Sequence, residues 1–268
     1  MKKLFISTDL QLPMQAVTET FAILAKRGMG KTHTASVLAE EMLEAGAHVV
    51  IIDPVGVWFG LRVAADGKKP GFPILIIGGD KADLPLDPGT GTLIADLVID
   101  KKVSVILDLS KLRKGEQAHF MADFAERIYQ RNRDPLHLII DEADAFAPQK
   151  PQHGQERMLG AIDDIVRRGR ARGLGVTLIT QRSAVINKDV LTQAEVLICL
   201  RLISPQDRAA VLEVIARAPS YISRETIGER AGKSIRSSQF DAALANLRSL
   251  GLIDYGANRT VYATVEVK

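Results

Sequence analysis

The chain has 268 residues, of which 46% are hydrophobic and 25% are charged, and its formal net charge is +3. This length allows one full-size domain with a small companion, and the composition is ordinary for a globular protein. So small a net charge does not by itself indicate nucleic-acid binding. The single cysteine excludes an internal disulfide and a cysteine-cluster metal site. No apolar stretch reaches the roughly 18 residues of a membrane span, and the N-terminus makes a poor signal peptide, so we expect a cytoplasmic protein without membrane contact.

Short, unbroken apolar runs recur along the first three quarters of the chain, and such runs are typical of strands covered on both faces. They lie at residues 21–25, 48–53, 73–77, 103–108, 136–141, 175–180 and 196–202. Cys199 falls in the last run, so we expect a buried structural thiol. Amphipathic helices are predicted between the runs at 32–45, 116–130 and 155–168. Strands that alternate with helices predict an α/β domain with a mainly parallel sheet.

The pattern changes after about residue 205, where three short helical segments precede a hairpin. Ser238 and Asp241 form a capping box that starts the third helix. The segments 252–255 and 260–265 flank four turn residues, which predicts a β-hairpin. Three helices followed by a hairpin are typical of a winged helix-turn-helix. We therefore expect two domains, at 1–205 and at 206–268.

A glycine-rich segment follows the first predicted strand and opens the first predicted helix. Its residues are Ala25, Lys26, Arg27, Gly28, Met29, Gly30, Lys31 and Thr32. This context fits a P-loop, although Ala25 stands where the pattern has its first glycine. The loop N–H groups and the helix N-terminus would bind phosphate oxygens, Lys31 would neutralise the β- and γ-phosphates, and Thr32 would bind Mg²⁺. The segment predicts ATP binding, with the neighbouring His33 also beside the nucleotide; an ordinary glycine-rich turn is the alternative.

Two adjacent acidic residues, Asp141 and Glu142, follow the apolar run that begins at residue 136. A strand tip with two carboxylates is a Walker B motif, in which Asp141 binds Mg²⁺ through water and Glu142 polarises the attacking water. A solvated acidic strand end is the alternative, and the lysine of the glycine-rich loop argues against it. The strand inserted between the two motif strands is expected among the runs at 48–53, 73–77 and 103–108.

Polar residues also end the run at 175–180. Because the carboxyl ends of parallel strands line the ligand crevice, we expect Thr180 and Gln181 to lie near the γ-phosphate or its attacking water. Just upstream is a cluster of four arginines, Arg167, Arg168, Arg170 and Arg172. Three interpretations of this cluster stay open: a solvated basic helix end, a DNA-phosphate patch, or an arginine finger that reaches the ATP of a neighbouring subunit.

Together these segments resemble the HerA/FtsK superfamily of hexameric DNA-pumping ATPases, most closely the bacterial HerA-like proteins. The resemblance covers residues 20 to about 205 and rests on the segments 25–32, 52–56, 141–143, 169–173 and 180–183. It implies a RecA-like P-loop NTPase core with ATP and Mg²⁺ as cofactors. It further implies that Gln181 is a sensor, that Arg170 is the arginine finger, and that Asp53 lies near the active site. Val57 stands where the family has glutamate, and Ser183 where it often has proline.

The resemblance also implies partners: a homo-oligomer, with a hexamer expected, double-stranded DNA, and a nuclease or other effector protein. HerA-type members carry a β-barrel before the ATPase, and only some 20 residues precede the loop here. We therefore expect the hexamer to form through the ATPase face alone or with an associated protein.

DNA contact is expected from a small set of basic residues: Arg168, Arg172, Lys233, Arg236 and Arg259. Residues 218–268 carry seven basic and five acidic side chains, so DNA contact and protein docking by this module both stay open. Two rivals to a DNA translocase also stay open. One is an ATP-dependent assembly subunit of an effector complex, such as a phage-defence system, and the other is a winged-helix regulator with a degenerate ATPase.

Overall fold

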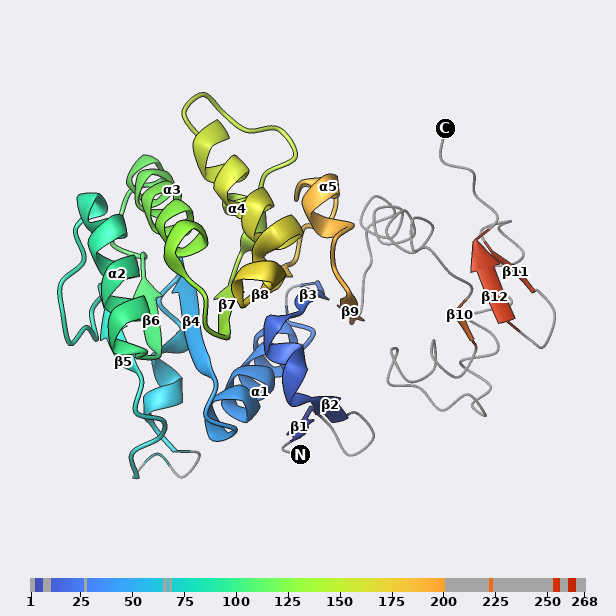
Figure 1. Cartoon of the computed structure of the whole chain (residues 1–268), viewed down its shortest axis with the longest axis horizontal. Coiled ribbons are helices and arrows are strands. Elements are labelled where there is room, and N and C mark those ends of the chain that lie inside the picture. Colours follow the sequence, from blue (N-terminus) through green and yellow to red (C-terminus); the bar gives the residue numbers. More distant parts are fainter. Residues whose placement is uncertain are drawn as a thin grey trace.

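The computed structural model describes residues 3–6, 11–26, 28–64, 67, 69–200, 222–223, 253–255 and 260–263. Its centre is a seven-stranded sheet whose strand order is β5-β6-β4-β7-β8-β3-β9 (Figure 1). The strands are β3 (Thr20–Leu24), β4 (His48–Asp53), β5 (Leu75–Ile77), β6 (Val105–Asp108), β7 (Leu136–Ile140), β8 (Leu174–Thr180) and β9 (Val196–Cys199). Every neighbouring pair is parallel, which confirms the predicted sheet.

Helices cover both faces of this sheet. They are α1 (Lys31–Glu44), α2 (Gly91–Lys101), α3 (Lys114–Arg131), α4 (Glu156–Arg168) and α5 (Lys188–Leu191). Short 3-10 helices are η1 (Met14–Thr18), η2 (Trp58–Arg62), η3 (Pro88–Thr90), η4 (Ala143–Ala145) and η5 (Gly169–Arg172). Helices α2, α3 and α4 lie on one face and α1 lies on the other (Figure 1).

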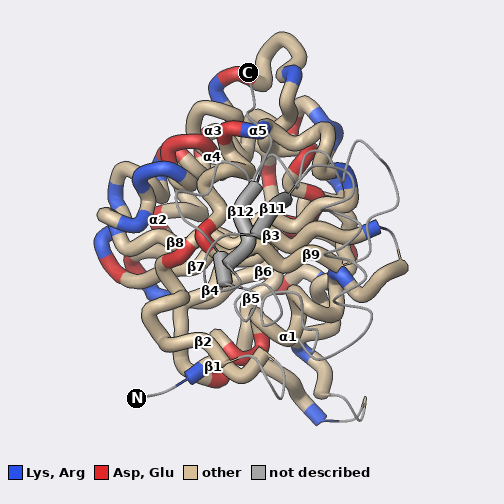
Figure 2. The backbone as a smooth tube through the Cα atoms, turned by 90° about the vertical axis from the view of Figure 1, so that its right-hand side faces the viewer, with Lys and Arg blue, Asp and Glu red and all other residues tan. Residues whose placement is uncertain are grey.

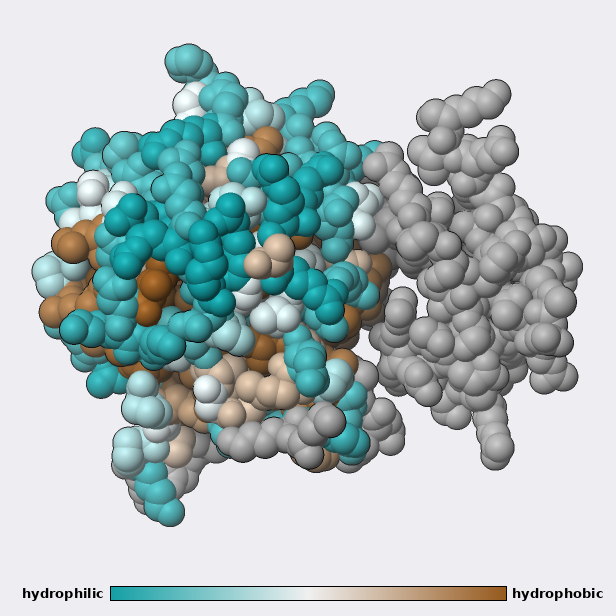
Figure 3. All heavy atoms as spheres, viewed as in Figure 1, coloured by the Kyte–Doolittle hydropathy of each residue, from teal (hydrophilic) through white to brown (hydrophobic). Residues whose placement is uncertain are grey.

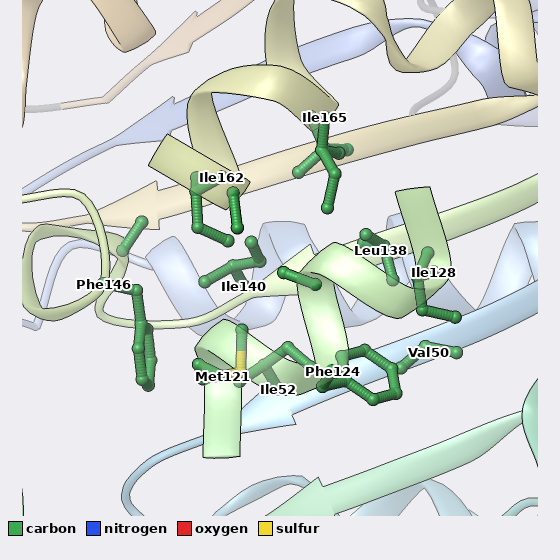
Figure 4. Packing of buried hydrophobic residues seen from close by; sticks show 14 of the residues in the cluster. Val50, Ile52, Met121, Phe124, Ile128, Leu138, Ile140, Phe146, Ile162 and Ile165 are labelled. Atoms are coloured by element: carbon green, nitrogen blue, oxygen red, sulfur yellow. The ribbon is translucent and has the colours of Figure 1, made fainter. Parts of the chain in front are cut away.

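Side-chain alternation along the strands divides the core into two layers. On β4, Val50 and Ile52 face α3 and α4, whereas Val49 and Ile51 face α1. The first layer is seen in Figure 4, where side chains of α3 and α4 pack on residues of β4 and β7. The apolar faces of the predicted amphipathic helices lie in these layers and are buried. They consist of Ala35, Leu38, Ala39 and Met42 on α1, and Phe120, Phe124 and Ile128 on α3.

The strand between the two motif strands is β8, which corrects the prediction that it comes from residues 48–53, 73–77 or 103–108. Strand β8 pairs with β3 on one side and with β7 on the other. It follows the acid pair in the chain, and the crossover through α4 places it between two strands that come earlier in the sequence. As a result, the polar tip of β8 lies between the glycine-rich loop and the acid pair.

Helix α2 was not predicted, because its first residues, Thr90-Gly91-Thr92, have the composition of a turn. A side chain at Gly91 would lie 2.6 Å from the carbonyl oxygen of Phe120, so the glycine permits α2 and α3 to pack closely. Ion pairs join the two helices at their surface. Arg127 and Arg131 bind Asp96 and lower the pKa of its carboxyl to about 2. Over α3 and α4 the molecular surface is mostly hydrophilic, whereas hydrophobic groups show on the side of α2 (Figure 3).

Smaller features lie at the two ends of the described chain. Strands β1 (Lys3–Phe5) and β2 (Gln11–Pro13) form an antiparallel hairpin that was not predicted. Strands β11 (Ile253–Tyr255) and β12 (Thr260–Ala263) pair antiparallel, which confirms the predicted hairpin, and β10 (Ile222–Ser223) joins β12. The three helices predicted between 205 and 251 lie outside the described residues. Cys199 is half-buried rather than fully buried, and burial raises the pKa of its thiol to about 11.

Candidate functional site

The glycine-rich loop joins the carboxyl end of β3 to the amino end of α1. Gly28 and Gly30 have φ angles of 78° and 87°, in the left-handed region that glycine adopts without strain. Gly30 is the N-cap, and Lys31 is the first helical residue. Ala25 is fully buried, and its N–H donates to the carbonyl oxygen of Thr180 over 3.3 Å, so alanine fits at the first position of the pattern.

Most of the other loop residues face solvent. Lys26, Gly28, Met29, Gly30, Thr32 and His33 are exposed, and Arg27 lies outside the described residues. The N–H groups in the first turn of a helix have no partner inside the helix and carry a partial positive charge. The exposed loop and the start of α1 therefore form a surface suited to an anion.

Lys31 is the link between this loop and the acid pair. Its ammonium group lies 3.3 Å from Oδ1 of Asp141 and 3.2 Å from Oε1 of Glu142. The Lys31 side chain is 9% exposed and that of Asp141 is 4% exposed. A buried carboxylate of this kind needs a cation or N–H donors, and it has both here. The structure thus brings together the two motifs that the sequence indicated.

Glu142 has a backbone conformation that is rare for its residue type. Its φ angle is 45°, in the left-handed region, and its own N–H donates to Oδ1 of Asp141 over 2.8 Å. A non-glycine residue held there costs on the order of 1 kcal/mol, and such residues gather at functional sites. The bend turns the Glu142 side chain toward Lys31 while Asp141 stays at the end of β7.

The tip of β8 completes the site. The side-chain amide of Gln181 lies 3.5 Å from both carboxylate oxygens of Glu142, a weak contact at this distance. Thr180 points to another partner, since its hydroxyl donates to Asp144 over 2.6 Å and accepts from the N–H of Arg182 over 2.9 Å. Gln181 therefore lies beside the acid pair, whereas Thr180 fixes the strand tip to η4. Contact of either residue with the γ-phosphate or its attacking water stays a prediction.

The Asp53 carboxylate binds backbone N–H groups of the loop that follows β4. Its Oδ1 accepts from the N–H groups of Val55 and Gly56 over 3.0 and 2.7 Å, and its Oδ2 accepts from that of Trp58 over 2.8 Å. Burial is the largest effect on this carboxyl and raises its pKa, with the nearby Asp108 adding to the rise. Contact of Asp53 with a nucleotide stays a prediction. Val57, at the family's glutamate position, is 48% exposed.

Sequence reasoning missed Trp58. Its indole N–H donates to Oδ2 of Asp141 over 3.0 Å, whereas Lys31 donates to Oδ1 of the same carboxylate. The signal that could have found it is a tryptophan five residues after the aspartate that ends β4, in a loop that must pass the carboxyl edge of the sheet.

The residues present fit a magnesium nucleotide. Mg²⁺ takes one or two protein oxygens and completes its shell with phosphates and water, so it needs no cage of side chains. In the described part of the chain no group of three or more His, Cys, Asp and Glu forms such a cage. Thr32 and Asp141 offer a hydroxyl and a carboxylate next to the anion-binding loop, which is the donor set that Mg²⁺ prefers.

A comparison with family models gives a match over residues 6–257 to the family described as helicase HerA, central domain. The match takes in nearly the whole chain. The chain belongs to the HerA central-domain family. It is accordingly a HerA/FtsK-type P-loop protein, as the resemblance implied.

Two archaeal HerA proteins are similar to it over part of their length. The DNA double-strand break repair helicase HerA of Pyrococcus furiosus is 30% identical over 125 residues, which are 47% of this chain and 21% of the relative. The probable DNA double-strand break repair helicase HerA of Methanocaldococcus jannaschii is 30% identical over 144 residues, 54% of this chain and 27% of the relative. The matches thus span about a quarter of these curated relatives.

A solved structure shares the fold. The genome packaging NTPase B204 from Sulfolobus turreted icosahedral virus 2, in complex with sulfate, superposes with a TM-score of 0.51 and 16% identity. The superposition covers 94% of this chain and 98% of that chain. At this level of identity the likeness establishes the P-loop NTPase fold, in agreement with the parallel sheet.

The arginine cluster of this HerA-family chain lies directly before β8, at the end of the sheet opposite to the acid pair. Arg167 and Arg168 form ion pairs with Asp163 and Asp164 one turn earlier, Arg170 binds Glu195 over 2.6 Å, and Arg172 stacks over Tyr129 at 4.2 Å. Positive and negative segments also interleave over α3 and α4 (Figure 2). These contacts agree with a solvated helix end; roles in DNA binding or as a finger stay predictions.

The remaining expectations concern the C-terminal part and the membrane. Lys233, Arg236 and Arg259 lie outside the described residues, and the domain boundary near residue 205 stays a prediction. Among the helices that the structure describes, none has the length and apolar character that a bilayer crossing requires.

Proposed function

We propose that this chain is a Mg²⁺-dependent ATP hydrolase. The observation that carries the proposal is the pair of ionic contacts from Lys31 to Asp141 and Glu142. They join a phosphate-type loop to an acid pair at the carboxyl ends of the parallel strands. Ligands bind at the carboxyl ends of the strands in open α/β sheets. Bound Mg²⁺ would neutralise charge that develops on the transferred phosphoryl group.

Each residue has a distinct task in this proposal. Lys31 and the loop N–H groups would bind the phosphates, and Thr32 and Asp141 would hold the metal. Glu142 orients the attacking water and takes its proton, while Gln181, 3.5 Å from the Glu142 carboxylate, orients water and carboxylate together. Lys31 moves from the carboxylates to the phosphates when the nucleotide binds, which leaves Glu142 free to act as the base.

For the whole protein we propose a homo-hexameric ring that translocates double-stranded DNA in the cytoplasm, with a nuclease as a candidate partner. The family and the names of the curated relatives support this. Arg170 fits this proposal, because β8, seven residues long, separates it by about 20 Å from the carboxyl ends of the strands, where Glu142 lies. At that distance Arg170 does not reach the site of its own chain, so a finger role would be played at the site of a neighbouring subunit. We also propose two domains, 1–205 and 206–268, with a winged helix in the second.

An ATP-dependent assembly subunit without translocation is the second candidate. The intrachain partners of Arg168 and Arg172 favour it, since a side chain engaged with Asp164 or Tyr129 is less available to DNA phosphates. In this case the ring would hold an effector protein in its ATP-bound form.

Two measurements separate the candidates: the mass of the assembly formed with ATP, and the rate of ATP hydrolysis with and without duplex DNA. A translocase is expected to form a hexamer with ATP and to hydrolyse ATP faster when duplex DNA is added at low salt. An assembly subunit would bind its effector only with ATP and would keep the same rate with DNA. A monomer that neither hydrolyses ATP nor responds to DNA would contradict both.

A further inference from the structure

The indole ring of Trp58 lies beside the acid pair. Its N–H donates to Oδ2 of Asp141 over 3.0 Å, whereas Oδ1 of that carboxylate accepts from Lys31 over 3.3 Å and from the N–H of Glu142 over 2.8 Å. Trp58 is 2% exposed and Asp141 is 3% exposed. Because donors hold both oxygens, the carboxylate is fixed in its rotation about the bond to Cβ.

Trp58 is itself held from two sides. The Asp53 carboxylate accepts its backbone N–H over 2.8 Å, and the same carboxylate fixes the preceding turn through Val55 and Gly56. The ring packs in the core layer that contains Leu61 and Ile139. The donor atom is thus preorganised by the scaffold, as groups that orient a metal ligand commonly are.

A buried indole N–H needs an acceptor in any protein, so a purely structural role must be weighed. Two facts point further. The acceptor is the carboxylate that the proposed function assigns to Mg²⁺. In addition, Lys31, the ionic donor to Asp141, is also the residue assigned to the phosphates. When Lys31 turns to phosphate, Trp58 and the Glu142 N–H are the described donors that still fix Asp141.

We propose that Trp58 is a positioning residue that keeps the Asp141 carboxylate in its metal-binding orientation, with Asp53 as the anchor of Trp58. This proposal rests on the proposed function. It predicts that loss of the indole N–H weakens Mg²⁺ binding while the fold and the metal-free affinity for nucleotide persist.

The contact itself can be tested by NMR, because Trp58 is the only tryptophan of the chain. In the full-length protein with ¹⁵N-labelled indole, one N–H signal is expected. Asp141→Asn replaces a charged acceptor with a neutral one, so this signal should move upfield; Glu142→Gln, whose side chain does not bind the indole, should move it much less. A signal that Asp141→Asn leaves at the wild-type position would overturn the proposal.

The effect on the metal is tested with Trp58→Phe, which keeps most of the ring volume. Calorimetric binding of a non-hydrolysable ATP analogue should need about 10-fold more Mg²⁺ for half-saturation, with unchanged binding in EDTA. Phe21→Leu is the matched control, since Phe21 is buried in the same core layer as Trp58. This variant should lose thermal stability but keep the wild-type Mg²⁺ dependence.

The outcomes separate this proposal from the one on which it rests. Trp58→Phe with the Mg²⁺ dependence of wild type would overturn the positioning role while the hydrolase proposal stands. Wild-type protein that binds no nucleotide would defeat both, and an indole signal that still moves in Asp141→Asn would then assign a structural role to the contact.

Discussion

Lys31 and Asp141 are 110 residues apart in the chain, and their Nζ and Oδ1 atoms lie 3.3 Å apart in the structure. This contact joins the amino end of α1 to the carboxyl end of β7. In the sheet, β8 lies between β7 and β3, the strand that leads into α1. Both charges are largely withdrawn from water, so each depends on the other. The Asp141 carboxylate also accepts from the N–H groups of Trp58 and Glu142, and the Lys31 ammonium also donates to Glu142. A triphosphate would offer Lys31 a second set of anions, and the exchange between the two sets is central to the proposed chemistry.

Glu142→Gln is expected to bind ATP normally and to hydrolyse it at least about 100-fold more slowly, because the amide cannot take a proton from water. Single-turnover hydrolysis with radiolabelled ATP, together with filter binding, measures both properties. Glu126→Gln, which changes a surface carboxylate paired with Arg157, is the control and should keep the wild-type rate. Equal rates in the two variants would remove Glu142 from the catalytic role.

Gln181→Ala should slow hydrolysis by about 10-fold or more while nucleotide affinity stays constant, because its amide lies beside the Glu142 carboxylate. Steady-state rates at saturating ATP measure the effect. A double variant with Glu142→Gln gives a sharper test: if the two residues act on the same water, the second change adds little to the first. Fully additive losses would show that Gln181 acts independently.

Arg170→Ala should retain ATP binding and lose on the order of 10³-fold in turnover if Arg170 is a finger for the neighbouring site. Mixing decides the direction: in rings that combine Arg170→Ala with Glu142→Gln subunits, some sites receive an intact Glu142 from one subunit and an intact Arg170 from the next. Such mixtures should regain turnover. Arg167→Ala, which breaks only the pair with Asp163, is the control. Full activity of Arg170→Ala alone would place the finger elsewhere.

His137 predicts a pH dependence of stability that is separate from catalysis. Its Nδ1 donates to the Val17 carbonyl and its Nε2 accepts from the Thr177 hydroxyl, each over 2.7 Å, and burial lowers its pKa to about 4. The unfolded chain, with an ordinary pKa near 6.5, therefore binds the proton first. The free energy of unfolding should be highest above pH 6.5 and fall by up to about 3 kcal/mol as the pH drops to 4.

Urea unfolding between pH 4 and pH 7 measures this dependence. His137→Leu should be less stable near pH 7, because it leaves two buried polar groups unpaired, and should have a flatter pH profile, so that its difference from wild type narrows toward pH 4. His48, whose pKa burial also lowers, contributes a part of the wild-type slope that remains in the variant. An unchanged slope in His137→Leu would contradict the assignment.

Local features of this chain were readable from the sequence because they rest on local rules. Unbroken apolar runs gave all seven strands of the main sheet, and the strongest helical stripes gave α1, α3 and α4. The glycine-rich loop and the acid pair were recognisable because their chemistry demands fixed residue types at fixed spacing. Helix α2 was missed because its first residues, Thr90-Gly91-Thr92, have the composition of a turn. The close contact with α3 that requires Gly91 is not visible in any local pattern.

Features that depend on strand order were not readable. The crossover through α4 places β8 between β3 and β7. Buried parallel strands have similar apolar sequences, so the sequence does not reveal which of them are neighbours. The same limit hid Trp58, since its contact with Asp141 spans 83 residues and requires β4 and β7 to be neighbours. Asp53 was placed near the site by family resemblance, but its loop-holding role emerged only with the backbone geometry.

The central claim is that the Lys31 loop and the acid pair form one Mg²⁺–ATP site. Calorimetric titration of wild type and Lys31→Ala with Mg²⁺ and a non-hydrolysable ATP analogue tests it most directly. We expect one nucleotide bound per wild-type chain, and binding about 100-fold weaker in Lys31→Ala, since a charge-assisted contact with phosphate is lost. Wild type that takes up no nucleotide, or Lys31→Ala that binds as tightly as wild type, would contradict the claim.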